Sequence, residues 1–228
     1  MNPLNVLRDS WFFFSRNLGA LVPLCLPLIV LEGLAQLALN RWAGAQATPV
    51  YDVLAALLFY PLYTAALILF LDARSRGLQP RAPDLLTLAL RLWPSFAVLA
   101  ALSTLLIMLG ASLFVLPGLW VMIKLAFAEY LLVLRGLTPL AALRESFLLS
   151  SGQFWRIAAC MLSVMLPLWL LDAWSYQQLG EQPAALPALL LDSATGFLQL
   201  FATVVLFRLY MLVSAPPAEE QRGRSGSP

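Results

Sequence analysis

The chain has 228 residues, of which 61% are hydrophobic and only 11% are charged. Soluble domains are about 45–50% apolar and about 25% charged, so this composition excludes an ordinary soluble domain and predicts a protein of the lipid bilayer. Histidine is absent, which excludes imidazole bases and histidine metal sites. The net charge of +2 is too small to indicate a nucleic-acid partner. Cys25 and Cys160 lie in apolar runs and are interpreted as core residues rather than as a disulfide pair.

Six apolar runs are long enough to cross a membrane. A bilayer core of about 30 Å needs about 20 mostly apolar residues in a helix. In chain order, the predicted spans are residues 18–39, 51–71, 96–116, 119–134, 155–174 and 197–213.

The third and fourth runs are separated only by Pro117 and Gly118. One straight helix over residues 96–134 would be about 58 Å long at 1.5 Å per residue, nearly two membrane thicknesses. Proline and glycine favour a turn, so a hairpin turning at residues 116–118 is predicted. Because the fourth run is short, it is either a tilted span or a re-entrant segment, and both return the chain to the same side.

A short amphipathic helix in the inner interface is expected before each hairpin. These helices are predicted at residues 1–17, 82–94 and 138–152. In the first, Leu7, Trp11 and Phe14 recur with helical spacing on one face. Such helices either only anchor and orient the spans, or they recruit lipids or a partner.

The first and third of these segments match each other at a constant offset. Arg8 corresponds to Arg144 and Ser10 to Ser146, and such polar matches are less easily produced by chance than apolar ones. The sequence therefore predicts a parallel internal repeat. The expected fold is an all-α integral membrane protein, with six transmembrane helices arranged as three hairpins and an interfacial amphipathic helix before each hairpin.

The basic residues indicate the orientation. All the lysines and arginines except Arg41 and Lys124 fall on one side of this topology, and that side is expected to be cytoplasmic. Residues 1–213 are predicted to form a single polytopic membrane domain with a cytoplasmic N-terminus, and residues 214–228 a disordered cytoplasmic tail. Residues 43–47 resemble a signal cleavage site, but the apolar stretch before them is too long for a signal peptide, so we expect it to be retained.

Three charged residues inside the predicted spans are the candidate site residues: Glu32, Lys124 and Glu129. Charge at membrane depth is costly, so each is a functional candidate by default. Glu32 and Lys124 lie at similar predicted depths, which favours a buried ion pair that fixes helix packing. The alternatives are a site that couples a proton or solute, and snorkelling without a fixed partner. The acidic residues at the outer ends of the spans, Asp52, Asp172 and Asp192, are expected to be solvated.

No enzyme signature is present. Lys124 could in principle activate Ser112, but serine in such helices commonly bonds its own backbone. The sequence contains no glycine-rich phosphate loop and no acidic metal cluster. We therefore expect no catalytic residues, no cofactor and no metal.

Several short segments carry a family resemblance. They are residues 116–120, 124–128, 142–146 and 151–155. With these segments the chain resembles the YciC-type family of uncharacterised bacterial inner-membrane proteins, and it is similar to membrane domains attached to some glycerophosphodiester phosphodiesterases. The resemblance implies a multi-pass protein of the bacterial inner (plasma) membrane and brings no catalytic residues.

Two functional classes follow from these observations. The first is a non-catalytic protein that acts through membrane lipids, a membrane-protein partner or a second copy of the chain; the basic amphipathic helices favour it. The alternative is a transporter or channel for a small solute that uses Glu32, Lys124 and Glu129.

Overall fold

The computed structural model describes residues 3–44, 49–179 and 185–214, and every regular element in these ranges is a helix. The helices are α1 (Pro3–Arg16), α2 (Leu18–Ala43), α3 (Pro49–Ser75), α4 (Ala82–Leu113), α5 (Val115–Lys124), α6 (Ala128–Arg135), α7 (Pro139–Ser151), α8 (Phe154–Leu179) and α9 (Ala185–Ser214). Six segments are long and apolar enough to cross a membrane: Leu18–Ala43, Val50–Ser75, Ala82–Leu113, Val115–Arg135, Phe154–Ser175 and Leu186–Ser214. The prediction of an all-helical protein with six apolar runs is confirmed at this level.

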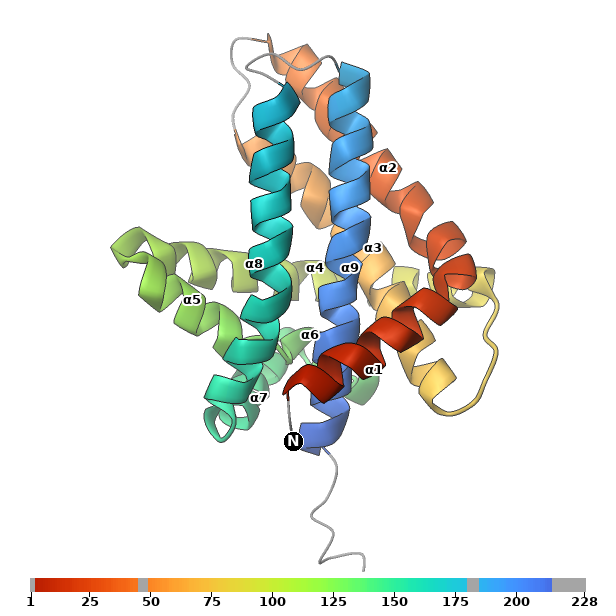
Figure 1. The fold of residues 1–228 in the computed structure, drawn as a ribbon, viewed down its shortest axis with the longest axis vertical. Coiled ribbons are helices and arrows are strands. Elements are labelled where there is room, and N and C mark those ends of the chain that lie inside the picture. Colours follow the sequence, from red (N-terminus) through yellow and green to blue (C-terminus); the bar gives the residue numbers. More distant parts are fainter. Residues whose placement is uncertain (1–2, 45–48, 180–184, 215–228) are drawn as a thin grey trace, which may run out of the picture.

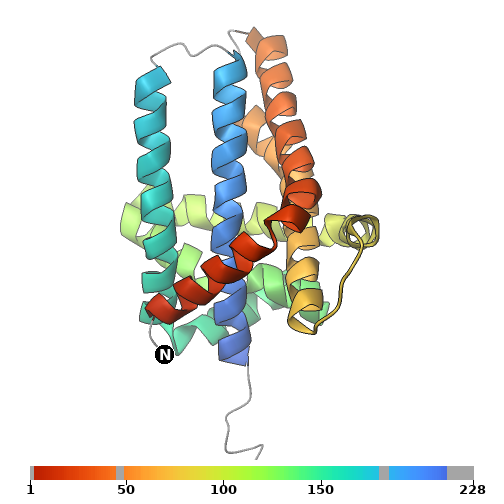
Figure 2. The ribbon, with the colours of Figure 1, turned by 45° about the vertical axis from the view of Figure 1, so that its right-hand side comes forward.

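Four long helices, α2, α3, α8 and α9, run roughly along the long axis of the molecule (Figures 1 and 2). Helix α9 packs against both α8 and α2. Helix α1 crosses α9 near the end of the bundle where α9 finishes (Figure 1). Helix α4 lies across the long axis in both views, and the α4–α5 pair projects to one side of the bundle in Figure 1.

The direction of α4 follows from its length. The predicted interfacial segment 82–94 and residues 96–113 of the predicted span 96–116 form one helix, with Pro94 inside it. An interior proline removes one backbone hydrogen bond, but apolar helices tolerate it without ending there. The prediction of a separate interfacial helix at residues 82–94 was therefore wrong. Because a helix stays nearly straight, the apolar part of α4 continues in the direction of its first turns.

The reversal between α4 and α5 occurs earlier than predicted. The chain turns at Phe114, whose backbone is extended (φ −164°, ψ 158°). Pro117 lies in the first turn of α5, where a missing N–H costs little. A Cβ on Gly118 would lie 2.8 Å from the Ala111 Cβ and 2.9 Å from its Cα, so Gly118 allows backbone-to-backbone packing of α4 and α5. The turn predicted at residues 116–118 is corrected to Phe114.

The fourth predicted span, 119–134, is interrupted. Residues 125–127 form a turn that separates α5 from α6, and backbone groups freed inside an apolar region must find other partners. The Ser146 hydroxyl accepts a hydrogen bond from the Phe127 N–H (3.1 Å) and donates one to the Lys124 carbonyl (2.9 Å). Ser150 also donates to that carbonyl (3.1 Å). Helix α7 therefore supplies hydrogen-bond partners for the backbone groups that the interruption frees. Glu129 lies in the first turn of α6.

Helix α1 buries one side against the bundle and exposes another. Val6, Ser10 and Phe14 are buried, whereas Trp11 is 56% exposed. Lipid and protein interior are both apolar, so apolar spacing alone does not show which side of a membrane helix faces protein. The boundary between α1 and α2 at Asn17 and the boundary between α7 and α8 after Gly152 agree with the predicted segments.

Candidate functional site

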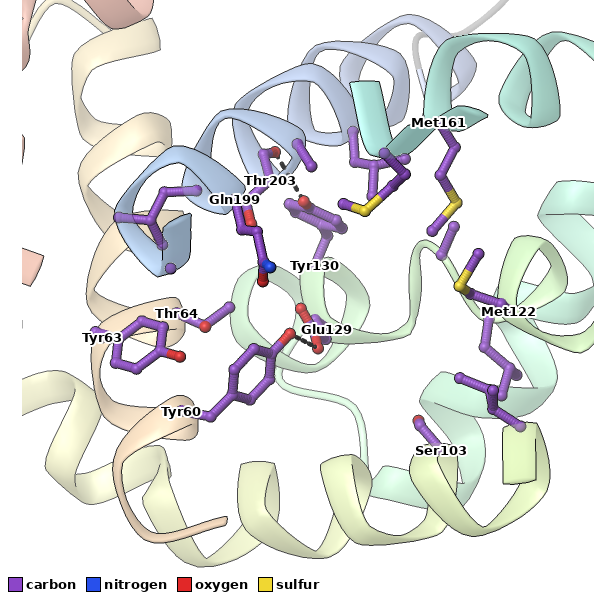
Figure 3. A pocket seen from close by; sticks show the side chains of 18 residues that line it. Tyr60, Tyr63, Thr64, Ser103, Met122, Glu129, Tyr130, Met161, Gln199 and Thr203 are labelled. Carbon is purple, nitrogen blue, oxygen red and sulfur yellow. Dashed lines mark hydrogen bonds between the residues drawn. The ribbon is translucent and has the colours of Figure 1, made fainter. Parts of the chain in front are cut away.

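A cavity of about 240 Å³ lies in the middle of the bundle, among residues of α3, α4, α5, α6, α8 and α9 (Figure 3). Its wall is mostly apolar, with methionine side chains of α5 and α8 on one side. Tyr60, Glu129, Tyr130 and Gln199 bring polar groups to the opposite part of the wall (Figure 3). An apolar cavity with a few convergent polar groups is the usual form of a small-ligand site.

Glu129 is the charged residue of this cavity. Tyr60 on α3 donates a hydrogen bond to Glu129 Oε1 (2.6 Å), and the close-up shows the two side chains meeting at the cavity edge (Figure 3). The turn at residues 125–127 places Glu129 here, since α6 starts again at Ala128 with a new direction. Glu129 also lines a neighbouring cavity of about 290 Å³ between α3 and α4.

Aromatic rings close the cavity on the side toward the end of α9. Tyr130 is buried, and its hydroxyl donates to the Thr203 carbonyl (2.8 Å). The Tyr130 ring stacks on Tyr210 with centroids 5.6 Å apart and lies 6.2 Å from Phe207. Phe127 lies 6.0 Å from Tyr210. We call these four rings the aromatic floor (Phe127, Tyr130, Phe207 and Tyr210).

A second cavity, of about 250 Å³, adjoins the first and contains Glu32. Tyr63 and Gln199 line both cavities, so the two are neighbours. Glu32 interacts with the side chain of Tyr63, and Gln36 donates a long hydrogen bond to Glu32 Oε1 (3.5 Å). Two aspartates, Asp172 of α8 and Asp192 of α9, complete the acidic lining.

A third cavity, of about 380 Å³, continues toward the start of α3. It shares Gln36 and Asp192 with the second cavity and ends at Asn40 and Asp52. The Asn40 amide donates to Asp52 Oδ1 (2.9 Å). Helix α2 approaches α9 closely along this row, because a Cβ on Gly33 would lie only 2.7 Å from the Leu189 side chain.

The three cavities form a row that carries only acidic charge, and we call it the acidic row. Its carboxylates, listed from the cavity at the start of α3 to the cavity in the middle of the bundle, belong to Asp52, Asp192, Asp172, Glu32 and Glu129. Among the residues that the structure describes around these cavities, none is a lysine or an arginine. Carboxylates that line a cavity favour a positively charged occupant.

Lys124 lies apart from this row. Its side chain is 6% exposed, and its ammonium donates to Ser151 Oγ (2.8 Å). The same ammonium lies 4.9 Å from the ring centroid of Phe147 and 5.6 Å from that of Trp120, within the range of cation–π attraction. The structure describes both Glu32 and Lys124, and it forms no ion pair between them. The similar depth was estimated for straight spans, whereas α5 ends at Lys124 beside α7.

The structure thus brings Glu32 and Glu129 to one row of cavities, whereas Lys124 lies apart from it beside the rings of Trp120 and Phe147. Sequence reasoning missed Tyr60 and Tyr63, which contact the two glutamates. Their spacing of three residues on an apolar helix was the available signal, since such pairs share one face. Within the described ranges no three aspartate, glutamate or cysteine side chains group as metal ligands would.

Six apolar helical segments and an acidic row enclosed by them define a polytopic membrane protein. The model of one family, described as "Uncharacterised protein family (UPF0259)", matches residues 46–212. The chain belongs to this family. The narrower resemblance to YciC-type proteins and to phosphodiesterase-associated membrane domains stays an expectation.

Individual relatives agree with this assignment. The chain is similar to a protein named "UPF0259 membrane protein" from Yersinia pestis (strain Pestoides F), with 27% identity over 160 residues. The same identity holds for a UPF0259 membrane protein of Yersinia pseudotuberculosis serotype O:1b (strain IP 31758). Each match covers 70% of this chain and 62% of the relative, so the chain spans less than two thirds of the length of these relatives. No solved structure matches the chain.

Proposed function

We propose that the protein moves protons or a small cation along the acidic row, from the end near Asp52 toward Glu129. The observation that carries this proposal is the continuity of the three cavities through shared lining residues, together with the carboxylates of Glu32 and Glu129 in their lining. Buried carboxylates in membrane helices commonly form proton relays or cation pathways. The proposal retains Glu32 and Glu129 of the solute-transport hypothesis and leaves Lys124 out of the path.

The two ends of the row differ in their surroundings. The cavity at the Asp52 end has a volume of about 380 Å³, and the cavity at Glu129 has a volume of about 240 Å³. Each cavity is large enough for several waters, and each has the polar groups that ordered water requires. Beyond Glu129 lie the packed rings of the aromatic floor. We infer that the row is entered from the Asp52 end and that these rings limit access from the other, as alternating access requires of one of its states.

The test uses the purified full chain in liposomes that contain a pH-sensitive dye. A pH gradient, a sodium gradient and a potassium gradient are imposed in separate experiments, with empty liposomes as the reference. The wild type is expected to dissipate at least one gradient. Glu129→Gln should abolish most of this flux while preserving the fold, because the amide oxygen can still accept the hydrogen bond from Tyr60.

The matched control is Glu145→Gln. Glu145 is also a glutamate on a helix, but it pairs with Arg135 outside the row, so this variant should transport like the wild type. If no gradient decays faster than in empty liposomes, or if Glu129→Gln transports as fast as Glu145→Gln, the proposal fails.

A second candidate is a non-catalytic role through membrane lipids, a membrane-protein partner or a second copy of the chain. The observation that favours it is the tip of the α4–α5 pair, where Leu113, Phe114, Val115 and Leu116 are strongly exposed. Apolar side chains in such a position must be covered by acyl chains or by another protein. Cross-linking from a cysteine placed at residue 115 would distinguish the two: protein adducts support a partner, and their absence in native membranes supports lipid.

We also propose that both ends of the chain face the cytoplasm of a bacterial cell. The end of α9 and the beginning of α1 lie at the same end of the bundle (Figure 1), and the arginines at this end include Arg74 and Arg208. Positive charge favours the cytoplasmic side. Single cysteines at residues 8 and 44 are labelled with a membrane-impermeant maleimide in intact inner-membrane vesicles of known orientation. The two positions should lie on opposite sides, so that the cysteine at residue 8 is labelled only where the cytoplasmic side faces out and the cysteine at residue 44 only in the reverse orientation.

A further inference from the structure

A pocket of about 350 Å³ lies between α1, α3 and α9, at the opposite end of the molecule from Asp52. It is separate from the acidic row and shares no lining residue with its cavities. Phenylalanines of α1 and α9 make one wall apolar, and the other wall carries Asp9, Ser10, Arg74 and Arg208. The pocket therefore combines an apolar surface with positively charged groups.

Two polar groups in this pocket are buried without a partner. Ser10 is 2% exposed, and its hydroxyl makes no hydrogen bond. The Arg74 Nε–H is also buried and unbonded. Buried donors are nearly always satisfied in folded proteins. The corresponding serine of α7, Ser146, uses its hydroxyl both as donor and as acceptor, so the unbonded Ser10 calls for a partner from outside the chain.

The charge of the pocket favours an anion. Arg74 and Arg208 contribute two positive charges, and Asp9 contributes one negative charge. The Asp9–Arg208 contact is long (3.6 Å), and both side chains are about half exposed, so such a pair is weak and leaves most guanidinium donors free. The Arg74 guanidinium lies 5.5 Å from the Phe70 ring centroid, which helps to hold its planar donors in position. Arginine forks match the geometry of phosphate oxygens.

We propose that this pocket binds the phosphate of an anionic phospholipid headgroup. Arg74 and Arg208 donate to the phosphate oxygens, and the Ser10 hydroxyl supplies a third donor. The apolar wall receives the first part of an acyl chain. Trp11 and Phe12 of α1 are exposed, and Phe12 lines the pocket, as expected for a helix at the membrane interface. Basic pockets between membrane helices are known to hold acidic headgroups.

The test is native mass spectrometry of the full chain in detergent, titrated with phosphatidylglycerol. The wild type is expected to retain one lipid. Arg74→Gln combined with Arg208→Gln should weaken binding by roughly tenfold or more, because charge-assisted hydrogen bonds are lost. Ser10→Ala, a small change that the fold should accept, should give a smaller loss. Arg76→Gln is the matched control, since Arg76 is exposed and pairs with Asp72.

Two further ligands distinguish the source of the phosphate. Phosphatidylcholine, whose headgroup has no net charge, should bind less tightly than phosphatidylglycerol. If inorganic phosphate stabilises the wild type but not Ser10→Ala, and phosphatidylglycerol is not retained, the anion site stands and its lipid source is refuted. If phosphatidylglycerol binds equally to the wild type, to Ser10→Ala and to the double variant, and phosphate has no effect, the proposal is overturned.

Discussion

Ser146 is the residue whose loss should most directly weaken the turn between α5 and α6. Its hydroxyl is fully buried, accepts from the Phe127 N–H and donates to the Lys124 carbonyl. In Ser146→Ala the carbonyl keeps its bond from Ser150, but the Phe127 N–H has no other bond in the structure. An unsatisfied buried donor costs about 1–3 kcal/mol, and this is the expected loss in the free energy of unfolding.

Thermal unfolding in detergent, followed by tryptophan fluorescence, measures this loss. For a chain of this size 1 kcal/mol corresponds to roughly 2–4 °C in Tm, so Ser146→Ala should lower Tm by about 2–12 °C. Ser150→Ala should cost less, because the carbonyls that it contacts keep other donors. Ser163→Ala is the control: its hydroxyl only donates to the Ala159 carbonyl on an exposed face. A Tm for Ser146→Ala no lower than that of Ser163→Ala would refute the reasoning.

Two other substitutions test the packing. Gly118→Val should separate α4 from α5 and lower Tm by several degrees, because its Cβ would meet the Ala111 backbone at 2.9 Å; Gly19→Ala, with open space around its Cβ, serves as the control, and equal Tm values would contradict the close approach. Lys124→Glu should reduce the yield of folded protein, since it places a carboxylate among aromatic rings, and adding Glu32→Lys should not restore that yield. Recovery in the double variant, measured by size-exclusion chromatography, would show that the two residues pair after all.

The sequence was sufficient to locate the apolar segments, because the thickness of a bilayer sets their length. It was not sufficient to separate a surface that faces lipid from one that faces protein. Trp11 and Ser10 of α1 illustrate this: the structure leaves the tryptophan 56% exposed and buries the neighbouring serine. Hydrophobicity separates residues that face water from residues that do not, but the lipid and the protein interior that surround a membrane helix are both apolar.

The candidate site was also only partly predictable. Glu32 and Glu129 were identified from the cost of charge at membrane depth, and both line the acidic row. Their neighbours depend on tertiary packing: the direction of α6 after residues 125–127 brings Glu129 to Tyr60. Proline positions were a poor guide to helix ends, because Pro94 lies inside α4 and Pro117 lies in the first turn of α5 rather than between the helices. A turn without glycine or proline, such as residues 125–127, left no signal in the sequence.

The turn between α5 and α6 also has a mechanical consequence. Its backbone groups are bonded to Ser146 and Ser150 of α7, so sliding α7 away would strip partners from buried N–H and C=O groups. We therefore expect α7, the end of α5 and the start of α6 to move together as one rigid body. A displacement of α7, which lies at the end of the bundle where α9 finishes (Figure 1), would then shift Glu129 relative to Tyr60. Events at that end of the molecule would in this way reach the carboxylate at the far end of the acidic row from Asp52.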